Sequence, residues 1–124
     1  DRERANQISL GSDVFLMPSL FEPCGITQME SMSCATPPLV RWTGGLVDTV
    51  RPYSEKDGTG FGFGGDSRNA ILRNLVTAVR EAKNLFDEHP REFSKVQRNG
   101  FKQRFLWSEA AARYISKVYA PLFP

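Results

Sequence analysis

The sequence predicts an α/β protein in which a parallel β-sheet is flanked by helices and followed by a helical C-terminal segment. Three observations support this fold class. Short continuous apolar runs alternate with segments of helical periodicity, polar or glycine-rich turns separate them, and the second half of the chain is helical in pattern throughout. The 124 residues are enough for one domain with a single hydrophobic core.

The first half of the chain is expected to contain three short strands. Residues 1–12 are mostly polar and are expected to form a loop or the tail of a helix. Residues 14–17, VFLM, predict a strand that is buried on both faces, because such strands are continuously apolar rather than alternating. The further elements expected are a helix ending near Cys34, a strand over 39–42, a brief helix over 46–50 and a glycine-weakened strand over 61–63.

The second half is expected to contain three helices. Apolar residues recur at helical spacing from Ile71 to Phe86, and Asp66 or Ser67 is expected to cap the start of that helix. Pro90 fits the first turn of a second helix, and Ser108 is expected to cap the last one.

Three strands are fewer than the roughly five or six of a typical sheet. Either a partner completes the sheet, or the chain is the back half of a nucleotide-binding domain, and we favour the second interpretation. The chain opens on Asp1 without an initiator Met, as expected for a piece of something longer.

Composition and charge exclude several classes of protein. Hydrophobic residues make up 40% and charged residues 24%, which is typical of a globular domain and not of a disordered tail or a coiled coil. A net charge of +2 gives no argument for a nucleic-acid partner, and no apolar run reaches the roughly 18 residues of a membrane span. No metal is expected, because Cys24 and Cys34 lack zinc-site spacing and His89 stands alone.

Residues 22–30, EPCGITQME, come directly after the first strand and open a helix. In an open parallel sheet, ligands bind outside the carboxyl ends of the strands. Gly25 allows a close backbone turn, and the first N–H groups of the helix attract an anion. A carboxylate at Glu22 beside such groups suits a ligand with both hydroxyls and phosphates.

The role of Glu30 has two open interpretations. It follows Glu22 by eight residues, about two helical turns, so both carboxylates could face one cleft. Thr27 and Glu30 also match a capping box, in which case Glu30 only closes the start of the helix. Glu22 could equally be an ordinary loop carboxylate.

Two glycine-rich segments differ in what they indicate about ligand binding. Gly44 and Gly45 follow the second strand and permit either the close approach of another group or a turn that needs positive φ. Residues 60–65, GFGFGG, match G-x-G-x-x-G, but a polar loop precedes them where the dinucleotide fingerprint needs a strand. A Rossmann dehydrogenase is therefore not expected.

Five segments of the chain carry a family resemblance. Residues 12–29 (SDVFLMPSLFEPCGITQM), 38–41 (PLVR) and 43–50 (TGGLVDTV) resemble the C-terminal domain of bacterial glycogen synthases and plant starch synthases. Residues 105–108 (FLWS) and the helix expected over 114–122 extend the resemblance over essentially the whole chain. It implies a partial Rossmann-like domain of GT-B fold that binds a nucleotide sugar, with the N-terminal acceptor domain outside residues 1–124.

The resemblance also implies an activity. Such enzymes are retaining glucosyltransferases that move glucose from ADP-glucose or UDP-glucose to the non-reducing end of an α-1,4-glucan, without a metal or cofactor. Glu22 would be catalytic and hold the hydroxyls of the donor glucose, the backbone around Gly25 would bind the distal phosphate, and Glu30 would meet the ribose. The implied donor-binding residues are Glu22, Cys24, Gly25, Ile26, Thr27 and Glu30, with Thr43, Gly44 and Gly45 as a turn beside the cleft.

The chain also departs from the pattern of the family. Ala35 stands where the family commonly has glycine, and the family's phosphate-binding Arg and Lys would precede Asp1. The chain alone is therefore expected to be inactive, and the parent is expected in the cytoplasm, or in the plastid of a plant or alga. The alternatives are another retaining GT-B glycosyltransferase and a non-catalytic module that associates with itself through an exposed sheet edge.

Overall fold

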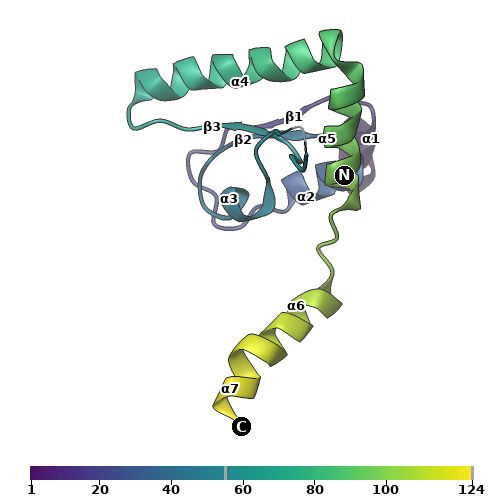
Figure 1. Cartoon of the computed structure of the whole chain (residues 1–124), viewed down its shortest axis with the longest axis vertical. Coiled ribbons are helices and arrows are strands. Elements are labelled where there is room, and N and C mark those ends of the chain that lie inside the picture. The colour runs from purple at the N-terminus through teal and green to yellow at the C-terminus, as the bar shows by residue number, and fades with distance from the viewer. Residues whose placement is uncertain (55, 124) are drawn as a thin grey trace.

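A computed structural model describes residues 1–54 and 56–123, apart from the side chain of Arg2. The described chain forms a three-stranded parallel sheet with helices on both faces and a helical arm that extends away from this body (Figure 1). The α/β fold and the helical C-terminal segment predicted from the sequence are thus confirmed.

The elements follow one another in the predicted order. The strands are β1 (Phe15–Met17), β2 (Pro38–Arg41) and β3 (Phe61–Phe63). The helices are α1 (Arg2–Leu10), α2 (Thr27–Ser33), α3 (Gly45–Thr49), α4 (Arg68–Glu88), α5 (Pro90–Lys102), α6 (Trp107–Tyr114), the π-helical turn η1 (Ile115–Tyr119) and α7 (Ala120–Leu122).

The sheet has the order β1-β2-β3, and its two faces bury two hydrophobic clusters. Successive residues of β2 point to opposite faces, so Leu39 packs beneath α4 and Val40 packs toward α2 and α3. The cluster on the α4 side contains Leu39, Phe61, Phe63, Ala78, Ala82, Leu85, Phe93 and Val96. The cluster on the other side contains Met32, Val40, Leu46 and Val50.

The prediction that the first strand is buried on both faces is wrong at Leu16. Leu16 pairs with Leu39, which pairs with Phe61, so the three side chains lie in one row on the α4 face. Leu39 and Phe61 are buried, whereas Leu16 is 50% exposed. The reason is that α4 packs mainly over β3 and β2, and an open hollow lies between this helix and Leu16.

The starts of two helices test the predicted caps. Ser67 caps α4, since its hydroxyl accepts a hydrogen bond from the Ala70 amide at 3.3 Å. Ser108 does not cap the last helix, because α6 already begins at Trp107 and Leu106 is the capping position. A serine inside the first turn cannot accept from the amides that a cap serves.

A sharp corner at His89 joins α4 to α5. The His89 amide donates to Leu85 O at the end of α4, and its carbonyl accepts from Glu92 and Phe93 at the start of α5. Across the corner the rings of Phe86 and Phe93 meet edge to face, with centroids 5.2 Å apart. The corner lets α4 cover one face of the sheet while α5 packs against α2 (Figure 1).

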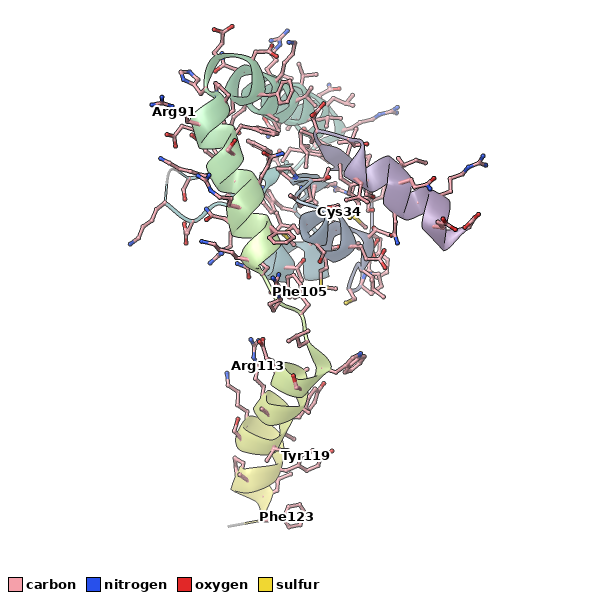
Figure 2. All side chains as sticks on the ribbon, turned by 90° about the vertical axis from the view of Figure 1, so that its right-hand side faces the viewer. Cys34, Arg91, Phe105, Arg113, Tyr119 and Phe123 are labelled. Atoms are coloured by element: carbon pink, nitrogen blue, oxygen red, sulfur yellow. The ribbon has the colours of Figure 1, made fainter. Side chains whose placement is uncertain are left out.

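The C-terminal arm, residues 105–123, stands clear of the body. Figure 2 shows Arg113, Tyr119 and Phe123 far from the sheet, beyond the connection at Phe105. No residue of α6, η1 or α7 is buried, and Trp107 is 89% exposed. In the described part of the chain, no helix has the combination of length and apolar character needed to cross a membrane.

Candidate functional site

The loop after β1 and the turn after β2 meet at the carboxyl edge of the sheet. The Gly45 amide donates to the carbonyl oxygens of Glu22 and Pro23, each at 3.2 Å. At the end of β2, the Arg41 guanidinium donates to Leu20 O at 2.8 Å. Two of the segments singled out in the sequence are therefore in direct contact, where ligands of open parallel sheets bind.

Gly44 has no room for a side chain. Its φ is +50°, and a Cβ there would lie 1.7 Å from the carbonyl oxygen of Glu22. A Cβ on Gly45 would lie 2.4 Å from Cys24 O. Both interpretations of this turn are therefore correct. Gly44 has a positive φ, and the two glycines allow the close approach of another group, which is the backbone of the Glu22 loop.

Gly25 is the buried centre of the loop. Its φ is +75°, and a Cβ there would meet the side-chain amide of Gln28 at 2.5 Å. The glycine thus turns the chain into α2 while keeping its backbone against a buried side chain.

The side chains predicted to bind the donor lie around an open surface. Glu22 and Glu30 are half-buried, whereas Cys24, Ile26 and Thr27 are exposed. Thr43, at the start of the neighbouring turn, is half-buried. Thr27 lies close to the end of β1 in space, and its hydroxyl donates to Met17 Sδ at 3.6 Å. The Glu22 carboxylate, the loop that carries it and the first turn of α2 therefore lie at the surface, beside the exposed apolar side chains of Leu20 and Phe21.

The capping-box interpretation of Thr27 and Glu30 is wrong. The capping position of α2 is Ile26, which makes no side-chain capping bond, and Thr27 is already the first helical residue. The argument that Glu22 and Glu30 share a helical register is also wrong, because Glu22 lies in the loop before α2. Helical spacing therefore says nothing about whether the two carboxylates face one cleft.

Sequence reasoning missed Gln28, which is completely buried on α2. Its Nε2 donates to Gly25 O and Thr49 Oγ1, each at 3.0 Å. The signal available was the spacing of Gln28, Ser31 and Met32 at i, i+3 and i+4, which places the three on one buried face. A long polar side chain on such a face needs internal partners.

The G-x-G-x-x-G segment serves packing. Gly62 lies within β3, and a Cβ there would be 2.3 Å from Cζ2 of the Trp42 indole. A Cβ added to Gly60 would likewise lie 2.4 Å from Pro38 O. Gly60 precedes β3, Gly62 lies within it and Gly65 follows it, so the motif does not begin after a strand as a dinucleotide fingerprint requires. Within the described residues, no group of three or more His, Cys, Asp or Glu side chains could hold a metal ion.

The fold is that of a glycosyltransferase domain, and the sequence profile of the family "Glycosyl transferases group 1" matches residues 1–99. The chain belongs to this glycosyltransferase family. Its curated relatives include the glycogen synthase of Desulfitobacterium hafniense, 47% identical over 121 residues, and that of Lachnospira eligens, 43% identical over 112. These alignments cover 98% and 90% of this chain but only 25% and 23% of the relatives.

Solved structures of glycosyltransferases are also similar to this chain. The catalytic domain of starch synthase IV from Arabidopsis thaliana, bound to ADP and acarbose, superposes with a TM-score of 0.82 at 28% identity, covering 98% of this chain and 24% of that one. Sucrose-phosphate synthase from Thermosynechococcus elongatus superposes with a TM-score of 0.60, also at 28% identity, covering 99% of this chain and 28% of that one. The glycosyltransferase fold predicted from the sequence is confirmed.

Proposed function

We propose that the full-length protein transfers glucose from a nucleotide sugar to the non-reducing end of an α-1,4-glucan, with retention of anomeric configuration. The observation that carries this proposal is the contact between the Glu22 loop and the Gly44–Gly45 turn, in a chain 47% identical to a glycogen synthase. The related starch synthase was solved with ADP and acarbose, which agrees with an adenine nucleotide and a glucan-like ligand.

Glu22 is the residue proposed to act on the donor. Its carboxylate is half-buried and its backbone is fixed by the Gly45 amide, so it can accept hydrogen bonds from sugar hydroxyls in one defined position. The backbone around Cys24, Gly25 and Ile26, which leads into α2, is proposed to meet the distal phosphate, because the first amides of a helix have no intrahelical acceptor. Glu30 is proposed as a contact to the ribose.

The chain spans about a quarter of the curated relatives it matches, so the rest of the catalytic cleft is assigned to segments outside it. We propose residues 1–124 as part of the C-terminal nucleotide-sugar-binding domain, with the glucan acceptor held by a separate N-terminal domain. The chain alone is then inactive. The cytoplasm, or the plastid of a plant or alga, stays the predicted location.

The test is incorporation of radiolabelled glucose into glycogen by the full-length protein, with ADP-glucose and UDP-glucose compared at equal concentration. Incorporation with ADP-glucose is the expected result, and a higher rate with UDP-glucose reassigns the donor only. Absence of incorporation from both donors contradicts the proposed activity, leaving another retaining glycosyl transfer for this fold.

A second candidate function, self-association without catalysis, is favoured by one observation. Leu16 is half exposed on the outermost strand, and the arm carries exposed apolar residues such as Trp107 and Phe123. Unpaired strand edges and apolar patches favour association. Sedimentation of the 124-residue chain separates the two cases, because a clean monomer across a wide concentration range contradicts a self-associating module.

A further inference from the structure

We propose that Gln28 is the positioning residue that fixes the Glu22 loop in its donor-binding shape. This inference rests on the proposed function for its catalytic consequence, but its structural part can be tested separately. Gln28 is fully buried on α2, and two carbonyl oxygens of the loop and one hydroxyl of α3 surround the nitrogen end of its side chain.

The orientation of the side-chain amide follows from its neighbours. Nε2 lies 3.4 Å from Cys24 O, 3.0 Å from Gly25 O and 3.0 Å from Thr49 Oγ1. Carbonyl oxygens only accept hydrogen bonds, so the group that faces them must be the NH2 end. Oε1 lies beneath Gly25, where it has no hydrogen-bond partner among the residues that the structure describes.

The hydrogen bonds of Gln28 continue into the neighbouring turn. Thr49 accepts from Gln28 and donates its own hydroxyl hydrogen to Gly45 O at 2.8 Å. The Gly45 amide in turn donates to the carbonyls of Glu22 and Pro23. The path therefore runs from Gln28 through Thr49 and Gly45 back to Glu22, and Gln28 holds the loop directly at Gly25.

The hydrogen bonds of this amide that join the loop to α3 are made by its NH2 end. Here the needed part is the NH2 donor, because no apolar side chain of the same size can bridge the loop and α3. Gln28 does not face solvent, so it acts through Glu22 and Gly25 and not on the substrate itself.

Two substitutions remove this bridge from its two ends. Gln28→Met keeps the length and loses the donor, and Thr49→Val keeps the shape and loses the hydroxyl. Ser31→Ala is the matched control, because Ser31 is equally buried on α2 but its hydroxyl donates only to Gln28 O within the helix. Thr49→Ser restores the hydroxyl and is the conservative rescue.

The experiment measures glucosyl transfer and backbone hydrogen exchange in the full-length protein. For Gln28→Met and Thr49→Val we expect kcat/KM to fall by about 10–100-fold through a higher KM for the nucleotide sugar, with an unchanged KM for glycogen. Exchange of the segment 43–50, which contains the Gly45 amide, should become faster. Ser31→Ala and Thr49→Ser should match the wild type in both measurements.

The outcomes separate the two levels of the inference. Unchanged exchange and unchanged KM in Gln28→Met and Thr49→Val overturn it, as does an equal effect of Ser31→Ala. If Gln28→Met does not fold, Thr49→Val alone decides. If the wild type transfers no glucose, the proposed function is wrong. Faster hydrogen exchange in the two variants would still support Gln28 as the positioning residue of the loop.

Discussion

Gly44 lies directly against Glu22: a Cβ on Gly44 would be 1.7 Å from the carbonyl oxygen of Glu22. The contact joins the turn after one strand to the loop after its neighbour, and it is backbone to backbone. No side-chain movement can relieve a clash of this kind. The position of the proposed catalytic carboxylate is therefore set by a glycine that carries no chemistry of its own.

Gly44→Ala should destabilise the chain and displace the Glu22 loop. Alanine is strained at a positive φ, and its Cβ would clash with Glu22 O. Together these two effects should lower the free energy of unfolding by at least about 2 kcal/mol. Urea denaturation of the 124-residue chain measures this. Gly64→Ala is the control, since a Cβ there makes only ordinary contact with Trp42 at 3.6 Å, and equal losses for both would contradict the argument.

Glu22→Ala should remove activity and leave the fold intact. The side chain is half-buried, and among the described residues no hydrogen bond or ion pair joins it to the core, so the free energy of unfolding should stay within about 0.5 kcal/mol of the wild type. Turnover of the full-length protein should fall by about 100-fold or more. The control is Glu92→Ala, a similarly half-buried carboxylate on α5. Near-normal turnover of Glu22→Ala would remove the catalytic assignment.

Ala35→Gly should stabilise the protein. Ala35 has a φ of +59° and follows α2 in a Schellman motif, in which the Thr36 amide donates to Ser31 O and the Ala35 amide to Met32 O. Glycine adopts this backbone without strain, so we expect a gain of up to about 1 kcal/mol. Ala70→Gly, within α4, should instead lose about 1 kcal/mol. A destabilised Ala35→Gly protein would contradict the predicted strain.

Gly62→Ala should displace the Trp42 indole. The added Cβ would lie 2.3 Å from Cζ2, and we expect a loss of about 1–3 kcal/mol from overpacking. Trp42→Phe should relieve much of this cost, so the double variant should lose less than the sum of the two single variants. Strict additivity in urea denaturation would show that the two positions do not contact each other.

Removal of residues 105–124 should leave the body unchanged. No residue of α6, η1 or α7 is buried. The free energy of unfolding of a chain ending at Arg104 should therefore lie within about 0.5 kcal/mol of that of the full 124-residue chain. Phe93→Ala provides the contrast, because Phe93 is buried in the core and its truncation should cost about 3–5 kcal/mol. A large loss on truncation would mean that the arm packs on the body.

The sequence predicted the order and kind of the elements because each depends on local information. Continuous apolar runs mark β1 and β2, and helical spacing of apolar residues marks α4. The exposure of Leu16 could not be predicted in this way. It depends on how far α4, a helix distant from Leu16 in the sequence, extends across the sheet.

The placement of the two candidate segments at one edge of the sheet was predictable, but their contacts were not. The rule that ligands bind at the carboxyl ends of parallel strands located the segments around Glu22 and Gly44. Their mutual contact depends on the pairing of β1 with β2, which no local pattern encodes. Gln28 was missed because a long polar side chain on a short helix is usually solvated, and only its three acceptors make burial possible.

The corner at His89 has a consequence for cooperativity. One residue, His89, ends α4 with its amide and begins α5 with its carbonyl, and the rings of Phe86 and Phe93 pack against each other across the corner. Fraying of either helix at this point would remove the terminus of the other. The last turns of α4 and the first turns of α5 therefore open as one unit, although they cover different parts of the body.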